Sequence, residues 1–258
     1  MATEYQYATA RPDLVLATDL DGTFLGGSVE DRRALYNWVQ AERSRVALVF
    51  VTGRDPDFIS ALCASGDVPA PDYVIGDVGT TIARFENLTL HPIAALEAPI
   101  LRRWHGKPEL VRTRLAAVRG LWLQPVPFRH RLSYQYDDRF NSDSLTVLDG
   151  LGVDILISHG CFVDILPEGV SKGPSLLRLL DHLKLPSTQV LVAGDTMNDL
   201  SMFQTGLHGA VVGGAESELL EATRALPLAY HCRAPGAGGI LEAIRAHSLV
   251  SSSPEVQP

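Results

Sequence analysis

Short, predominantly apolar runs separated by helical patterns constrain the fold of this chain more than any other feature. The runs cover residues 14–18, 46–51, 72–75, 190–193 and 209–212. Stretches with helical character lie at 28–43, 56–65 and 175–183. Continuous apolar strands without alternation are typical of a parallel sheet that is covered on both faces. The pattern therefore predicts an α/β fold with a doubly wound parallel sheet.

The segment from about residue 84 to residue 167 has a different pattern. Helical stretches are expected over 108–119 and 141–150, and strands over 121–124, 131–136, 153–158 and 161–166. A helix-strand-strand pattern that occurs twice predicts an α+β domain with an antiparallel sheet. We therefore predict a core domain formed by residues 1–83 and 168–258, with a second domain inserted over residues 84–167.

Composition excludes several classes of partner. The net charge is −8 and no basic run is present, which argues against a nucleic-acid partner. No apolar run approaches the ~18 residues of a membrane span, and the N-terminus has no apolar signal region. The scattered Cys63, Cys161 and Cys232 lack metal-ligand spacing, so we expect reduced thiols. We predict a cytoplasmic protein that binds neither nucleic acid nor membrane.

Pairs of acidic residues follow two of the predicted strands. Asp19 and Asp21 come directly after the first strand, and Asp195 and Asp199 follow the run at 190–193. Such a pair also occurs in ordinary turns, but neighbouring carboxylates repel one another unless a cation lies between them. Ligands of an open parallel sheet bind beyond the carboxyl ends of its strands, where these acids gather. The pattern predicts a site for a hard divalent cation with oxygen ligands.

Two further features extend this site. Thr52 and Gly53 follow the second strand, where a hydroxyl and backbone N–H groups can hold an anion. Lys172 precedes the helical stretch at 175–183. Alone, each fits a strand-ending turn or a surface charge. Together with the acids they indicate phosphoryl transfer, in which a carboxylate attacks phosphorus, a second carboxyl moves the proton, and a metal offsets charge repulsion.

The motifs DLDGT, VTGR, SKG and GDTMND resemble, in order and context, the four signature motifs of haloacid-dehalogenase (HAD) phosphatases. The inserted domain resembles their type IIB cap. The segments PDYVIGDVGTTI, LSYQYD, VDILPEGVSKG and AVVGGAESELL are similar to the sucrose-phosphate phosphatase branch, so the resemblance extends from about residue 14 to residue 244. One departure is Gly22, at a position where plant members of the branch typically have Asn.

The resemblance implies roles for the acids. Asp19 would be the nucleophile that forms an aspartyl phosphate, and Asp21 the general acid and base. The cofactor implied is Mg²⁺, with ligands from the side chains of Asp19 and Asp195 and from the backbone carbonyl of Asp21.

The resemblance also implies how phosphate is held. Thr52, Gly53 and Lys172 would bind the phosphate, and Lys172 would also orient the nucleophile. Asn198 and Asp199 would support the metal and the lysine.

The implied substrate is a phosphorylated sugar or glycoside, such as a sucrose-type, glycosyl-glycerol, glycosyl-glycerate or amino-sugar phosphate. Candidate residues for the sugar are Arg131, Tyr134 and Tyr136 on one strand of the cap, and His159 and Gly160 at a hairpin tip. The tyrosines also fit the core of the cap, and the arginine and histidine also fit an exposed surface.

Two other functions remain open from the sequence. A phosphotransferase or phosphomutase would share the aspartyl-phosphate step and deliver the phosphate to a sugar hydroxyl. A non-catalytic binding protein on this fold would be expected to lack Asp19 or Asp21, and both are present. The sequence therefore favours a HAD-type phosphomonoesterase.

Overall fold

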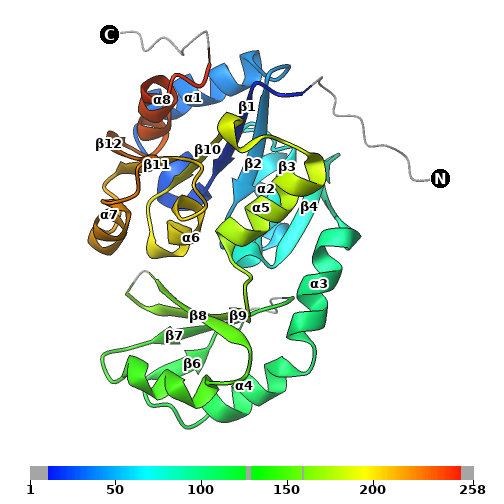
Figure 1. Ribbon diagram of the computed structural model, residues 1–258, viewed down its shortest axis with the longest axis vertical. Helices are drawn as coiled ribbons and strands as arrows, with labels where there is room; N and C mark the ends of the chain where they lie inside the picture. Colours follow the sequence, from blue (N-terminus) through cyan, green and yellow to red (C-terminus); the bar gives the residue numbers. More distant parts are fainter. Residues whose placement is uncertain (1–10, 126–128, 159, 251–258) are drawn as a thin grey trace, which may run out of the picture.

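The computed structural model describes residues 11–125, 129–158 and 160–250. Within them, the chain forms a larger part built on an eight-stranded sheet and a smaller part built on a four-stranded sheet (Figure 1). The smaller part, which we call the cap, is joined to the core by helix α3 (Ala94–Trp104) and by the segment that links β9 (Phe162–Pro167) to α5 (Lys172–Leu183).

The core sheet has the strand order β12-β11-β10-β1-β2-β3-β4-β5. The strands from β12 to β3 are parallel, and β4 and β5 continue the sheet antiparallel. The predicted doubly wound parallel sheet is thus confirmed. The bounds of these strands are β1 (Leu14–Thr18), β2 (Val46–Val51), β3 (Tyr73–Gly76), β4 (Thr81–Glu86), β5 (Thr89–Pro92), β10 (Val190–Gly194), β11 (His208–Gly213) and β12 (Ala229–Pro235).

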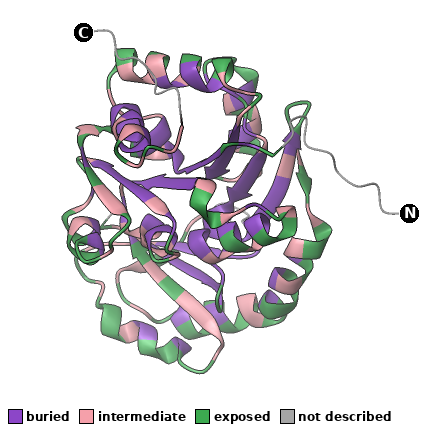
Figure 2. Ribbon diagram, turned by 45° about the horizontal axis from the view of Figure 1, so that its top comes forward, coloured by how far each residue is buried: buried purple, intermediate pink, exposed green. Residues whose placement is uncertain are grey.

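Helices cover both faces of this sheet, which explains why β1 is apolar throughout. Leu14 and Leu16 of β1 share one apolar cluster with α1 (Val29–Ala41), α2 (Pro56–Ala64) and α8 (Gly236–Ala246). Val15 and Ala17 point to the other face, where α5, α6 (Leu200–Phe203) and α7 (Ser217–Thr223) pack. Figure 2 shows buried strands enclosed by helices whose outer sides are exposed. Among the described residues, no helix has the length and apolar character that crossing a membrane requires.

Helix α1 illustrates how local sequence sets an element. The Ser28 side chain accepts a hydrogen bond from the Asp31 N–H (3.0 Å) and so caps the first turn. Leu35 and Trp38 are buried against the sheet, whereas Val29 is 54% exposed. A helix turns by about 100° per residue, so Val29 lies on the side opposite Trp38.

The cap is the expected α+β insertion. Its sheet has the antiparallel order β6-β7-β9-β8, with β6 (Leu121–Leu123), β7 (Leu132–Tyr136) and β8 (Val153–Ser158). Helices α3 and α4 (Lys107–Leu115) and the 3-10 turn η3 (Ser142–Leu148) pack on one face of this sheet. The other face is turned toward the carboxyl ends of the core strands, where Ser133, Ser158 and Asp164 border the same cavity as Asp19.

The core sheet extends further along the chain than the predicted boundary after residue 83. That boundary falls inside β4, and β5 continues the core to Pro92. Asn87 and Leu88 join the two strands as a two-residue turn in which both residues have a positive φ (52° and 59°). Such turns usually contain glycine, and its absence here removes the sequence signal of the hairpin.

Candidate active site

The predicted site residues meet at one edge of the core sheet. Strands β10, β1 and β2 are neighbours, and Asp195, Asp19 and Thr52 directly follow their last residues. Lys172 is the first residue of α5, which packs beside this edge. The strand order therefore brings together motifs that are up to 176 residues apart in the sequence.

Lys172 is fully buried and ties three side chains together. Its ammonium donates to Asp19 Oδ1, Asn198 Oδ1 and Asp199 Oδ1, each at 2.6 Å. A lysine has three N–H donors, so each of them has a partner. This network fixes the carboxylate of Asp19 and confirms that Lys172 is not a surface charge.

The protonation states follow from burial and charge. Burial alone would lower the pKa of Lys172, but the ion pairs with Asp19 and Asp199 outweigh it, and the pKa is raised. Lys172 therefore stays charged. Burial raises the pKa of Asp19 well above its ordinary value, Lys172 opposes this rise, and the charges of Asp199 and Asp195 add to it. A cation between these carboxylates would oppose the rise and keep Asp19 ionised.

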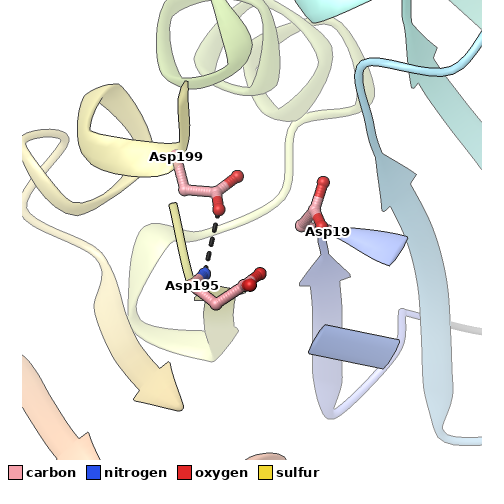
Figure 3. A group of neighbouring side chains, drawn as sticks. All are labelled: Asp19, Asp195 and Asp199. Atoms are coloured by element: carbon pink, nitrogen blue, oxygen red, sulfur yellow. Dashed lines mark hydrogen bonds between the residues drawn. The ribbon is translucent and has the colours of Figure 1, made fainter. Parts of the chain in front are cut away.

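Three carboxylates face one another at this point (Figure 3). Asp19, Asp195 and Asp199 each offer an oxygen, and these oxygens lie within 4.8 Å of one another. Both oxygens of Asp199 already accept hydrogen bonds: Oδ1 from Lys172, and Oδ2 from the N–H groups of Asp195 (2.9 Å) and Thr196 (3.0 Å). Asp19 and Asp195 are therefore better suited to hold a cation, and Asp199 to orient its neighbours.

Gly22 allows the loop after β1 to approach Asp195 closely. Its φ is +78°, and a Cβ placed there would lie 2.2 Å from Asp195 Oδ2. Thr23 next to it donates its hydroxyl to Asp195 Oδ1 at 2.6 Å. A side chain at position 22 would need Asp195 to move, so glycine fits this carboxylate arrangement.

Asp21 borders the same cavity as Asp19 and is held by an arginine. Arg54 donates to both carboxylate oxygens of Asp21, at 2.8 and 2.9 Å, and its guanidinium lies over the Phe58 ring at 4.4 Å. The VTGR motif contains Arg54, but no feature of the motif predicts a partner for its side chain. This pair is about half exposed, which leaves Asp21 accessible to solvent and to a substrate.

Thr52 and Gly53 form the turn after β2. Thr52 is buried, and its hydroxyl oxygen accepts from the N–H of Arg54 at 3.1 Å. Gly53 borders the cavity, and its carbonyl accepts from Arg131 of the cap at 2.7 Å. The predicted phosphate-binding turn is therefore in contact with the cap.

The cavity between core and cap has a volume of about 390 Å³. Besides the residues already described, it is lined by cap residues that are mostly polar: Gln124, Arg131, Ser133, Ser158, Phe162 and Asp164. Of these residues, only Arg131 was predicted from the sequence as a contact for the substrate. Alternation could have found others, because Ser133 and Asp164 stand between apolar residues that face the cap core.

The other cap candidates do not line this cavity. Tyr134 and Tyr136 point to the opposite face of β7, into or against the apolar core of the cap, so the expected contact of Tyr134 with substrate is corrected. Gly160 is exposed at the turn of the β8–β9 hairpin and is not among the lining residues. His159 lies outside the described residues.

Comparison with known proteins agrees with the similarity of the motifs to the sucrose-phosphate phosphatase branch. Residues 12–248 match the family model described as sucrose-6F-phosphate phosphohydrolase. The structure of the sucrose-phosphatase from Synechocystis, in complex with sucrose and phosphate, is similar with a TM-score of 0.80 and 27% identity, over 92% of this chain and 98% of that one.

Among curated relatives, coverage differs widely. A glucosylglycerol-phosphate synthase of Pseudomonas anguilliseptica is 42% identical over 89% of this chain, but the chain spans only 30% of that protein. A mannosylfructose-phosphate phosphatase of Agrobacterium fabrum is 29% identical over 93% of this chain and 98% of its own length. A probable sucrose-phosphatase of Arabidopsis thaliana is 31% identical, and the chain spans 60% of it.

Proposed function

The chain belongs to the sucrose-6F-phosphate phosphohydrolase family, and on this premise we propose that it hydrolyses the phosphate monoester of a glycoside with Asp19 as the nucleophile. The observation that carries the proposal is the buried Lys172–Asp19 pair at 2.6 Å, beside a cavity that polar cap residues close from the other side. The pair supplies a fixed carboxylate, and the cap supplies contacts for the rest of the substrate.

We propose a reaction in two steps at these residues. A carboxylate oxygen of Asp19 attacks phosphorus, and the bond from phosphorus to the sugar oxygen breaks. Asp21, protonated and released from Arg54 when the substrate is bound, gives its proton to that oxygen. Asp21 then takes a proton from water, which attacks the aspartyl phosphate and releases inorganic phosphate. Thr52 would hold an oxygen of the transferred group. The charge of Lys172, whose three donors fix Asp19, Asn198 and Asp199, would offset part of the negative charge of that group.

We propose Mg²⁺ as the cation. The donors at the site are carboxylate oxygens, which are ligands that this ion prefers. Asp19, Asp195 and the backbone carbonyl of Asp21 would hold it. When bound, the ion would offset the repulsion between the nucleophile and the phosphate.

The substrate class is inferred from the cap and the relatives. The cap lines the cavity with amide, hydroxyl and carboxylate groups and with the ring of Phe162, which suit sugar hydroxyls and a sugar face. The relatives are named for phosphates of sucrose, mannosylfructose and glucosylglycerol. We propose a phosphorylated glycoside, and the 42% identity to the synthase favours a glycosyl-glycerol phosphate.

A phosphate-release assay with Mg²⁺ tests this proposal. We expect turnover of glucosylglycerol phosphate, sucrose 6-phosphate or mannosylfructose phosphate to exceed that of phosphoserine and nucleotides. Asp19→Asn should lower kcat at least ~10³-fold, because it removes the nucleophile. Asp138→Asn, at an exposed position of the cap, is the matched control and should be unchanged.

Two results would overturn the proposal. One is Asp19→Asn with near-parental turnover. The other is activity confined to phosphoamino acids or nucleotides. Release of free phosphate, rather than its appearance on an added acceptor such as glycerol, separates hydrolysis from phosphotransfer.

A further inference from the structure

A buried arginine of the cap reaches into the phosphate-binding turn of the core. Arg131 precedes β7 and is only 5% exposed. Its Nη1 donates to Asp164 Oδ1 on β9 of the cap, and its Nη2 donates to the carbonyl of Gly53 in the core, both at 2.7 Å. One guanidinium therefore joins the two parts of the molecule at the site itself.

The cap holds this guanidinium in a fixed position. Asp164, its cap partner, also accepts a hydrogen bond from the hydroxyl of Ser133, the residue opposite it in the β7–β9 ladder. A buried guanidinium that lost its partners would be costly, so the arginine and Asp164 act as one unit. Arg131 and Asp164 can contact Gly53 of the core only when the cap lies against the core.

The core presents a second carboxylate to the same arginine. Asp77 is 1% exposed, and its Oδ1 lies 3.9 Å from Arg131 Nε. The Oδ2 atom accepts from the Thr81 hydroxyl at 2.9 Å. Burial raises the pKa of Asp77, and the charge of Arg131 opposes this rise. The arginine thus also compensates a buried acid of the core.

Asp77 belongs to a turn that is bonded to the phosphate-binding turn. Asp77 N–H donates to the Arg54 carbonyl and Val78 N–H to the Thr52 carbonyl, both at 3.1 Å. Both residues have a positive φ, 51° and 57°, which is uncommon for Asp and strained for the β-branched Val78. Surrounding contacts must hold such a turn, and Arg131 is one of them.

The peptide group between Gly53 and Arg54 connects Arg131 to the reacting phosphate. Its carbonyl accepts from Arg131, and its N–H, which belongs to Arg54, donates to the Thr52 hydroxyl oxygen. With its oxygen accepting there, the Thr52 hydroxyl can direct its own hydrogen toward a phosphate oxygen. The orientation of this one peptide therefore sets the orientation of a phosphate-binding group.

We propose that Arg131 is a positioning residue that couples the docking of the cap to phosphate binding, acting through the Gly53–Arg54 peptide on Thr52. The inference rests on the proposed function, since it assigns how the phosphate subsite of that reaction is ordered. It differs from a sugar contact in one testable respect. Loss of Arg131 must affect every phosphate ester, whatever its leaving group.

The test compares Arg131→Gln and Arg131→Lys on a glycoside phosphate and on p-nitrophenyl phosphate, which has no sugar. Loss of a buried charge-assisted hydrogen bond predicts that kcat/KM falls by about 10- to 100-fold for both substrates, by the same factor. Inhibition by inorganic phosphate should weaken in parallel. Lysine should restore little, because a point charge cannot bridge Asp164 and Gly53 as a planar fork does.

Two controls separate positioning from structure. Arg129→Gln removes a nearby cap arginine that pairs with Glu97 instead of the core turn, and it should leave both substrates unchanged. In a Thr52→Val background, Arg131→Gln should cost much less than in the parent, because the residue through which it acts is gone. Thermal unfolding of each variant shows whether it is folded. Because the double-mutant cycle compares folded variants only, a general loss of stability does not affect the coupling that it measures.

Each outcome decides the proposal. A loss confined to the glycoside phosphate would assign Arg131 to the sugar and overturn it, as would additive losses in the Thr52→Val background. A parental protein that turns over neither substrate would instead mean that the proposed function fails. Parental activity that Arg131→Gln leaves intact would mean that only this inference fails.

Discussion

At the residue scale, Asp199 shows how one side chain can serve two purposes. One of its oxygens accepts from Lys172, and the other accepts from two backbone N–H groups in the turn after β10. Asp199 therefore stabilises the charged form of Lys172 and also holds the turn that carries Asp195. Neither task requires it to touch a substrate, and it does not line the cavity.

Replacing Asp199 with Asn separates these tasks. An amide has one oxygen, so its NH₂ group must face either the Lys172 ammonium or the two backbone donors. An unsatisfied buried donor of this kind costs about 1–3 kcal/mol. We expect the free energy of unfolding to fall by that amount in urea denaturation without metal. Asp181→Asn, on the exposed side of α5, is the control, and equal stability of the two variants would contradict the assignment.

The chemistry of single residues was predictable, but their distant partners were not. Lys172 contacts Asp19 and Asp199, as the motifs imply, because motif residues lie at strand ends whose meeting the fold class dictates. The link from Arg131 to Gly53 joins residues 78 positions apart in different domains. No periodicity encodes such a contact, since it depends on how the cap is docked.

At the element scale, the sequence predicted central strands and missed peripheral ones. Strands β1, β2 and β10 are buried on both faces and read as apolar runs. The missed β12 lies at the edge of the sheet, where residues such as His231 and Arg233 are exposed. An edge strand has fewer buried positions, so its sequence carries little of the apolar pattern that identifies a strand.

The end of α8 is joined to β11 by a pair of histidines. His208 Nδ1 and His247 Nδ1 are 3.2 Å apart, and His247 Nε2 lies 3.3 Å from the Gly209 carbonyl. The carbonyl requires a proton on His247 Nε2, so in the neutral pair His208 donates to His247. Burial lowers the pKa of His208, and the neighbouring His247 adds to this shift.

This pair predicts a loss of stability in mild acid. An unfolded histidine takes up a proton near pH ~6.5, whereas the folded His208 resists it. The contribution of His208 to the free energy of unfolding should therefore fall as the pH drops below about 6.5 and stay level above it. His208→Gln should flatten part of this slope in denaturation curves between pH 7.5 and 5.5. Burial also lowers the pKa of His130, so His130 should account for part of the slope that remains in this variant. The exposed His182→Gln should retain the parental slope, and an identical slope in His208→Gln would refute the prediction.

At the scale of the whole molecule, acidic residues outnumber basic ones. The chain has a net charge of −8, and its active site concentrates Asp19, Asp195 and Asp199 around a single buried lysine. The core folds around this excess of negative charge because the sheet is held by apolar contacts on both faces. A cation that binds only the folded site must then stabilise the molecule.

The proposed binding of Mg²⁺ predicts a rise in the thermal stability of the protein. At a free concentration about 100 times the Kd, the folded state gains ~2.7 kcal/mol. For a chain of this length, each kcal/mol raises Tm by about 2–4 °C, so the expected rise is about 5–10 °C. Asp195→Asn removes one of the proposed ligands of the ion and should lose most of the rise, whereas Asp138→Asn on the cap should keep it. NaCl of equal ionic strength controls for general screening of the net charge. An equal rise with NaCl, or in Asp195→Asn, would show that the effect comes from the overall charge instead of the site.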